Sequence, residues 1–135
     1  MTKLKNKYTA FDTALTRLKE AIDLYEQQDN PVLLDGTIQR FEFCVELGWK
    51  MLKEYLEYEK IGEFNSPRSV IKECFQIGLI ENAEQWLDML DDRNLTSHTY
   101  DEEIAKEIYR NIITKYYNIL TNTRNKIKSV VENEK

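Results

Sequence analysis

The chain is short of the residues that interrupt helices and of the residues that bind metals. Its 135 residues include four glycines, two prolines, two cysteines and one histidine, and they fit one domain, residues 1–135. Because turn-forming residues are few beside many helix-forming Leu, Glu, Lys and Ile, the composition points to an all-α fold. Cys44 and Cys74 lie far apart with one histidine to join them. This excludes zinc-site spacing and a disulfide framework, so we expect reduced core cysteines, no metal and no cofactor.

Long apolar runs and an excess of positive charge are also missing. No apolar run approaches the roughly 20 residues that span a bilayer, and residues 1–7 are not followed by a signal-type hydrophobic region. We therefore expect a cytoplasmic chain with no membrane partner. The net charge is −5, from 19 Lys and Arg against 24 Asp and Glu. This argues against a general nucleic-acid binder, because sequence-independent affinity comes mostly from cations that neutralise phosphates.

Charge is unevenly distributed along the chain. Basic residues open and close it, and acidic residues crowd the stretch between positions 81 and 103. The basic residues are Lys3, Lys5, Lys7, Arg124, Lys126 and Lys128, and the acidic ones are Glu81, Glu84, Asp88, Asp91, Asp92, Asp101, Glu102 and Glu103. The acidic stretch is either a pair of solvated helix faces or a docking surface for a basic partner.

Apolar residues recur at alternating steps of three and four along most of the chain, which is the pattern of amphipathic helices. The first such helix starts at about Leu4 and ends at residues 28–31, and the second starts at about Leu33. Gly48 in the second helix forfeits about 1 kcal/mol of helix propensity. It either marks the close passage of a neighbouring helix or is simply tolerated there.

Three further helices follow. The serine and proline at 66–67 supply an N-cap and a first-turn proline, and the helix that they begin stops at Gly78, a left-handed residue. A fourth helix begins at about Asn82. The last one begins near Asp101, with Thr99 as its N-cap. Two long helices and three others predict an antiparallel bundle.

The one histidine lies in the segment Arg93-Asn94-Leu95-Thr96-Ser97-His98-Thr99-Tyr100. If a single helix ran through it, Arg93 and His98 would lie about 140° apart on the helical wheel, so we predict a break between them. With Thr99 as N-cap, His98 would lie just outside the last helix, beside its free N–H groups and positive dipole end. That position favours the neutral imidazole that a general base needs, and it offers an anion site.

These residue types suit metal-independent cleavage of RNA. Neutral His98 would remove the proton of a ribose 2′-hydroxyl, and Arg93 would stabilise the charge that grows on the phosphate, leaving a 2′,3′-cyclic phosphate. Asn94 and Ser97 would orient the phosphate or the imidazole. Because one histidine cannot readily act as both base and acid in a turnover, a homodimer would supply the second group.

The spacing Arg-x4-His on its own also fits a structural interpretation. In that interpretation His98 is satisfied at a helix boundary, Arg93 pairs with Asp88 or Asp92, and Tyr100 is an ordinary packed aromatic. Spacing alone leaves both interpretations open.

The segment from Arg93 to Tyr100 matches Arg-x4-His-x-Tyr, the motif of HepT toxins in the HEPN superfamily. Further segments resemble the branch called nucleotidyltransferase substrate-binding proteins, and together they cover nearly the whole chain. These segments are Phe11-Asp12 with Leu15, Ile38-Gln39-Arg40-Phe41-Glu42-Phe43, Glu46-Leu47-Gly48-Trp49-Lys50, Ser66-Pro67-Arg68, Gly78-Leu79-Ile80 and Trp86-Leu87-Asp88-Met89-Leu90-Asp91-Asp92.

The resemblance implies an antiparallel up-and-down four-helix bundle with an additional short helix, a homodimer, and a minimal nucleotidyltransferase (MNT) partner. In such pairs the HEPN member is a candidate ribonuclease toxin and the nucleotidyltransferase is its antitoxin. The resemblance also implies that the partner adenylylates Tyr100. The adduct would place bulk and negative charge two residues from His98, and so repel the substrate phosphate.

The older family label implies a second hypothesis, a non-catalytic subunit that binds a nucleotide or substrate and presents it to the nucleotidyltransferase. The acidic stretch and Arg40, on a heavily apolar helix, support it. Arg40 also has a simpler interpretation, pairing with Glu42, Glu46 or Asp92. A third hypothesis is an interaction-only bundle in which the motif is a relic. Loss of ribonuclease activity on changing Arg93 or His98 would distinguish the first hypothesis from the others.

Overall fold

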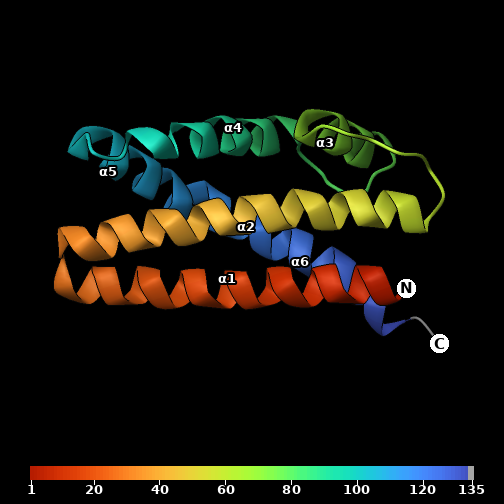
Figure 1. Ribbon diagram of the computed structural model, residues 1–135, viewed down its shortest axis with the longest axis horizontal. Coiled ribbons are helices and arrows are strands. Elements are labelled where there is room, and N and C mark those ends of the chain that lie inside the picture. Colours follow the sequence, from red (N-terminus) through yellow and green to blue (C-terminus); the bar gives the residue numbers. More distant parts are fainter. Residues whose placement is uncertain (134–135) are drawn as a thin grey trace.

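The computed structural model describes residues 1–133, and every regular element within them is a helix (Figure 1). The elements are α1 (Thr2–Gln28), α2 (Pro31–Tyr58), α3 (Pro67–Gln76), α4 (Ala83–Asn94), the 3₁₀ turn η1 (Leu95–His98), α5 (Glu102–Asn111), the π-helical turn η2 (Ile112–Tyr116) and α6 (Tyr117–Glu132). The prediction of an all-α chain is confirmed. The last three elements follow one another without a break and form one continuous helical rod, so the described residues form five helical rods.

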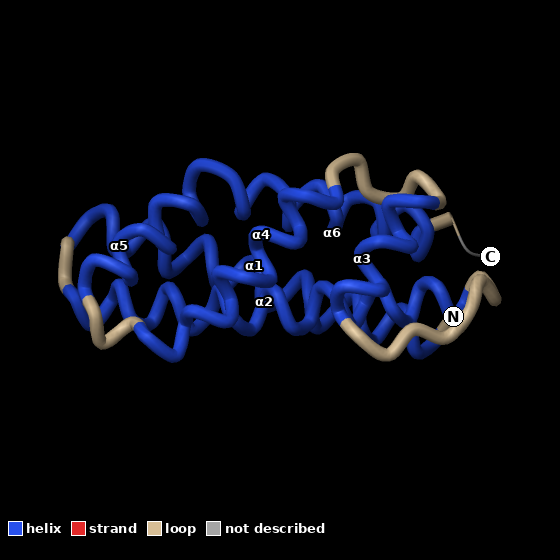
Figure 2. Tube along the Cα trace, turned by 90° about the horizontal axis from the view of Figure 1, so that it is seen from above, coloured by secondary structure: helices blue, strands red, loops and turns tan. Residues whose placement is uncertain are grey.

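Four of the rods run alternately up and down the bundle, and α3 is the additional short helix (Figure 1). α1 packs mainly on α2 and α6, and α3 packs on α2 and α4. Seen from above, the loops gather at the two ends of the bundle (Figure 2). This is the predicted four-helix bundle with an extra helix. No helix in the described part of the chain is both long and apolar enough to cross a membrane.

The helix ends follow local signals in the sequence. Asn30 caps α2 by accepting the N–H of Val32 at 2.9 Å, and because Pro31 occupies the first helical position, α2 starts two residues before the predicted start. Ser66 caps α3 with Ser69 in a capping box. Gly78 follows α3 with φ 81°, which confirms the predicted left-handed residue.

The core contains apolar side chains from every α-helix. A Cβ atom on Gly48 would lie 3.0 Å from Phe11 Cε1 and 3.1 Å from Trp86 Cη2, so side chains of α1 and α4 pass close to it. Of the two interpretations that the sequence left open for Gly48, the structure supports the close passage of a neighbouring helix. Cys44 and Cys74 are buried and unpaired, also as expected. Burial raises the pKa of each thiol to about 12.

Candidate functional site

The motif lies where α4 ends, at the end of the bundle away from the start of α1 and the end of α6 (Figure 1). Arg93 and Asn94 are the last two residues of α4. The backbone then tightens into the 3₁₀ turn that ends at His98. The predicted break between Arg93 and His98 is confirmed, because the α-helix stops between them.

The predicted cap of the last helix is wrong. Asp101 is the N-cap of α5, and its side chain accepts the N–H of Glu103 at 3.0 Å. An N-cap residue needs an extended backbone, which Asp101 has (φ −85°, ψ 111°), whereas Thr99 is still helical (φ −75°, ψ −1°). The Thr99 hydroxyl instead donates to the Thr96 carbonyl at 3.1 Å. His98 therefore lies three residues before the cap and not directly beside it.

Arg93 forms an ion pair with Glu46 of α2. Its Nε lies 3.0 Å from Glu46 Oε1, and the two side chains are 31% and 33% exposed. The Nε atom is buried, but its N–H does not point at the carboxylate well enough to form a hydrogen bond. The expectation that Arg93 pairs with Asp88 or Asp92 is therefore wrong. Arg93 has no other ion pair or side-chain hydrogen bond within residues 1–133, so its remaining N–H groups are available to an anion.

A second carboxylate of α2 holds the 3₁₀ turn. The Thr96 hydroxyl contacts the Glu42 carboxylate and lies 2.7 Å from the Arg93 carbonyl oxygen. Glu42 and Glu46 are four residues apart and so share one face of α2. One turn of α2 therefore fixes both the arginine and the segment that leads to the histidine. The sequence suggested these glutamates only as partners of Arg40.

The Arg40 side chain contacts residues of α1. Its Nη1 donates to the Arg17 carbonyl at 2.8 Å and lies 3.9 Å from Glu20 Oε2. Neither Glu42, Glu46 nor Asp92 pairs with it, so those expectations are wrong. The side chain is 34% exposed, and it reaches the surface between α1 and α2 instead of entering the core.

The Asp92 side chain accepts hydrogen bonds from residues of α5 and η2. Its Oδ2 accepts from the Tyr116 hydroxyl at 2.6 Å and from Asn111 Nδ2 at 3.0 Å. In a regular α-helix, residues five apart point about 140° away from each other. The π-helical turn between Asn111 and Tyr116 brings both toward Asp92. Burial and the hydrogen bond to Asp92 raise the pKa of Tyr116, so its hydroxyl keeps its proton.

Nothing in the sequence signals this π turn, because its apolar spacing fits a regular helix equally well. The predicted last helix was therefore uninterrupted. π turns often occur near functional sites, and this one ties the residue before Arg93 to α5 and η2. The Asp92 contacts thus restrain the last turn of α4 from one side while the two α2 carboxylates restrain it from the other.

His98 and Tyr100 are both exposed, and the structure brings them together. The Tyr100 hydroxyl lies 3.5 Å from His98 Nδ1, and the rings meet edge to face with centroids 6.0 Å apart. Tyr100 is 85% exposed, so it is not a packed aromatic. Both the imidazole and the phenol are therefore accessible from solvent. Within residues 1–133, no hydrogen bond or ion pair joins Arg93 to His98.

Asn94 and Ser97 have exposed side chains on the same turn. The Ser97 hydroxyl lies 3.5 Å from the Asn94 carbonyl oxygen, and neither side chain bonds to Arg93 or His98 in the described part of the chain. Their supporting roles stay predictions. Residues 1–133 also hold no group of three His, Cys, Asp or Glu placed to bind a metal.

The basic chain ends do not offset the acidic surroundings of the motif within one molecule. Lys3, Lys5 and Lys7 lie at the start of α1, and Arg124, Lys126 and Lys128 lie from the middle of α6 toward its C-terminal end. The start of α1 is at the end of the bundle opposite to η1 (Figure 1), and Arg124 pairs with Asp12 in the middle part of α1. Part of the acidic stretch is instead offset from nearby helices, because Arg68 of α3 forms an ion pair with Asp91 and Lys106 of α5 lies 3.3 Å from Glu102.

An up-and-down helical bundle with Arg-x4-His-x-Tyr at one end is the arrangement of a HEPN domain. The chain belongs to the HEPN/HepT-like family described as nucleotidyltransferase substrate binding protein like, which matches residues 6–129. The family predicted from the sequence is thus confirmed.

Three known proteins are similar to this chain in sequence or in fold. "Probable ribonuclease HepT" of Haemophilus influenzae is 39% identical over 85 residues, and the match covers 59% of this chain and 58% of that protein. A protein of Thermus thermophilus, known from its crystal structure, is 37% identical over 87% of this chain and 98% of that one, with a TM-score of 0.79. HI0074 of H. influenzae, described as having the fold of a substrate binding domain of a nucleotidyltransferase, is 27% identical over 90% and 98%, with a TM-score of 0.79.

A more distant protein shares the fold. The tri-AMPylated HEPN toxin of Shewanella oneidensis, solved in complex with its MNT antitoxin, is 19% identical over 97% of each chain, with a TM-score of 0.72. At that level of identity the likeness establishes the fold alone.

Proposed function

We propose that this chain is the HEPN-type toxin of a HEPN/MNT toxin–antitoxin pair, a metal-independent endoribonuclease that a nucleotidyltransferase partner neutralises. The observation that carries this proposal is the turn that presents an exposed His98 beside Tyr100, with Arg93 anchored one turn earlier on α4. Family membership supports it, and so does the name of the H. influenzae relative. The protein acts as one domain, residues 1–135, in the cytoplasm.

His98 is the general base that takes the proton of the ribose 2′-hydroxyl. The oxygen then attacks the adjacent phosphorus, the bond to the 5′-oxygen of the next nucleotide breaks, and a 2′,3′-cyclic phosphate remains. Arg93 stabilises the charge that develops on the phosphate oxygens. The leaving oxygen needs a proton, and a homodimer would bring a second His98 to supply it. Asn94 and Ser97 support the phosphate or the imidazole from the same turn.

Adenylylation of Tyr100 is the proposed means of control. The Tyr100 oxygen attacks the α-phosphate of ATP held by the partner, pyrophosphate leaves, and AMP stays on the phenol. The 85% exposure of Tyr100 makes it accessible to a second enzyme, and the description of the S. oneidensis toxin as tri-AMPylated supports the chemistry. An AMP group beside His98 would block the substrate phosphate by charge and by bulk.

A second candidate function is a non-catalytic nucleotide-binding or substrate-binding subunit. The description of HI0074 as a substrate binding domain favours it, and so does the acidic stretch, which disfavours RNA within a single chain. Here Arg93 would bind phosphate without cleavage.

Cleavage of total RNA by the purified protein in EDTA tests the first function. We expect wild type to leave cyclic phosphate ends, and His98→Ala and Arg93→Ala to abolish cleavage. Arg110→Ala is the matched control, because Arg110 is exposed on α5 and forms no ion pair among the described residues. No cleavage by a folded, unmodified wild-type dimer would favour the second function, and cleavage that survives both motif changes would reject the assigned site.

A further inference from the structure

A second candidate site lies at the other end of α4 from the motif. A cleft of about 470 Å³ opens between the loop after α3, the first turn of α4 and the middle of α6. The 12 residues of α4 separate it from the motif by about 18 Å, at 1.5 Å per residue. Its volume lies within the range of small-molecule sites.

The floor of the cleft is apolar and needs no polar partner. Trp86 is 1% exposed, and its indole N–H donates to Thr123 Oγ1 at 3.2 Å. The Thr123 hydroxyl in turn donates to the Ile119 carbonyl at 2.9 Å. Ile80 and Ile119 complete the apolar surface. A ligand would meet an apolar wall here with its own apolar face.

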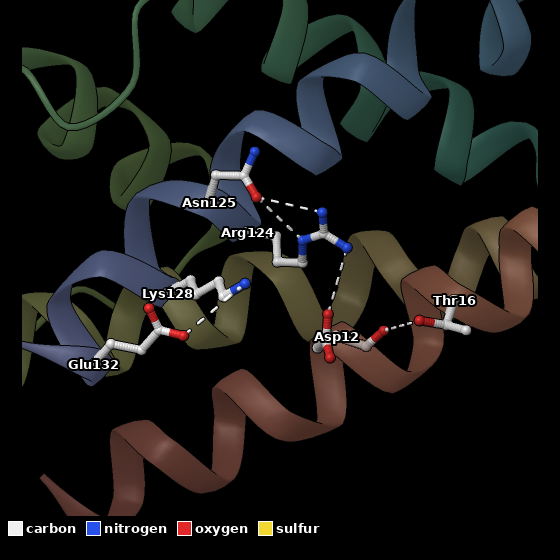
Figure 3. Close-up of polar contacts among 6 residues, drawn as sticks. All are labelled: Asp12, Thr16, Arg124, Asn125, Lys128 and Glu132. Carbon is white, nitrogen blue, oxygen red and sulfur yellow. Dashed lines mark hydrogen bonds and ion pairs between the residues drawn. The ribbon is translucent and has the colours of Figure 1, made fainter.

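The rim carries four carboxamides, and the structure fixes the orientation of two. Asn82 Oδ1 accepts the N–H of Gln85 at 3.0 Å, which leaves the Asn82 amino group free to donate. Asn125 Oδ1 lies 3.3 Å from both Nε and Nη2 of Arg124. A guanidinium can only donate, so the oxygen of Asn125 must face it and the amino group must face away, as Figure 3 shows.

Arg124 is itself held in place. Its Nη1 lies 3.5 Å from Asp12 Oδ1 of α1, opposite to its contacts with Asn125 (Figure 3). The chain Asp12–Arg124–Asn125 therefore sets one donor of the cleft before any ligand arrives, and such preorganisation lowers the entropic cost of binding.

The other two carboxamides are free to adapt. Neither the Gln85 nor the Asn122 side chain has a hydrogen-bond partner within residues 1–133. Glu81 and Lys126 add one charge of each sign, so the rim has no net charge. The rim thus suits an uncharged ligand that has both donors and acceptors along one edge and an apolar face. A nucleobase has this chemistry, and Asn and Gln pair with base edges through two hydrogen bonds.

We propose that this cleft binds a single unpaired nucleobase, with the base edge on the carboxamides and the base face on the wall formed by Ile80 and Ile119. The base could belong to a free nucleoside or to a strand of RNA. The site does not depend on ribonuclease activity, because it shares no residue with the motif.

Side-chain amide resonances in nitrogen-15 NMR spectra test the site directly. The four ribonucleosides are one series of titrations, and a short unstructured RNA is the other. We expect saturable shifts at the amino groups of Asn82, Gln85, Asn122 and Asn125. Binding of nucleosides would identify a free-ligand site, and binding of the RNA alone would identify a subsite for an RNA base.

Alanine variants of the cleft show whether its carboxamides contribute to nucleobase binding. Gln85→Ala and Asn122→Ala should each weaken binding about tenfold. Asn122 is exposed, so its variant remains informative if Gln85→Ala, which is half-buried, disturbs the fold. Gln27→Ala on α1 is the matched control, and it should leave affinity unchanged, as should His98→Ala, which keeps this test apart from the proposed nuclease.

Three results would overturn the site. One is the absence of saturable carboxamide shifts with every nucleoside and with the RNA at millimolar concentration. Another is equal weakening by Gln27→Ala and Asn122→Ala. The third is a full set of the same shifts with ribose 5-phosphate, which has no base.

Discussion

Nε of Arg93 lies 3.0 Å from Oε1 of Glu46, so the one cation of the motif is paired with a carboxylate of another helix. The pair couples the last turn of α4 to α2. In the proposed function, an RNA phosphate would bind the remaining N–H groups of Arg93 beside the Glu46 carboxylate, whose negative charge would oppose it. Because both side chains are about one-third exposed, solvent screens this repulsion and its energy is modest.

Glu46→Gln should therefore increase the affinity of the motif for RNA by about two- to fivefold, because it removes the opposing charge. The measurement is binding of a short RNA to proteins that also carry His98→Ala, so that no cleavage occurs. Glu63→Gln changes the net charge equally at the loop after α2. An equal gain with Glu63→Gln would mean that only total charge matters.

Tyr116→Phe should lower the free energy of unfolding by about 1.5–3 kcal/mol, because the Asp92 carboxylate loses a part-buried hydrogen bond to a charged acceptor. Urea denaturation measures the loss. Combined with Asp92→Asn, the change should cost less than the sum of the single changes. Tyr100→Phe, at an 85% exposed position, should stay within about 0.5 kcal/mol of wild type. Additive losses at positions 92 and 116 would argue against a coupled pair.

Two glycines of α2 should respond oppositely to alanine. Gly48→Ala should destabilise the fold by about 1–3 kcal/mol, since its Cβ would press on Phe11 and Trp86. A Cβ atom on Gly36 would have nothing within 4 Å, so Gly36→Ala should stabilise by up to about 1 kcal/mol through helix propensity. Thermal denaturation compares them, and a stabilised Gly48→Ala would contradict the close packing.

Stability should fall as the pH rises from about 9 toward 12. An unfolded cysteine thiol loses its proton near its ordinary pKa of 9.0, whereas burial raises the pKa of Cys44 and Cys74 to about 12. The unfolded state then binds fewer protons than the folded state, which costs up to about 1.4 kcal/mol per pH unit for each thiol. Urea denaturation at pH 8, 9 and 10 measures the slope.

Cys44→Ala removes one of the two buried thiols. The free energy of unfolding of this variant should therefore fall less steeply with pH, by the contribution of one thiol. Native thiols should also resist a thiol reagent that labels the unfolded chain completely. Rapid labelling of the native protein would show that these cysteines are not protected by the core.

Much of the fold followed from signals that act over a few residues. The three-four spacing of apolar residues predicted the helices, and Ser66, Pro67 and Gly78 predicted the ends of α3. The position of Gly48 left close packing and a merely tolerated glycine both open, and the structure decided for close packing. The break after Asn94 could be predicted because Arg93 and His98 would point about 140° apart on one continuous helix and could not act on the same group. Caps were harder, since both Thr99 and Asp101 are suitable residue types and backbone conformation decided between them.

The sequence by itself determined the helices, the motif and the family. Only the tertiary structure decided that Glu46 and not Asp92 faces Arg93, that Asp92 contacts Tyr116 of a π turn, and that the start of α1 lies at the opposite end of the bundle from η1. The physical reason is one of range. Helix formation and capping depend on neighbours within one turn, whereas the partner of a side chain depends on how each helix is rotated and packed against residues distant in the sequence.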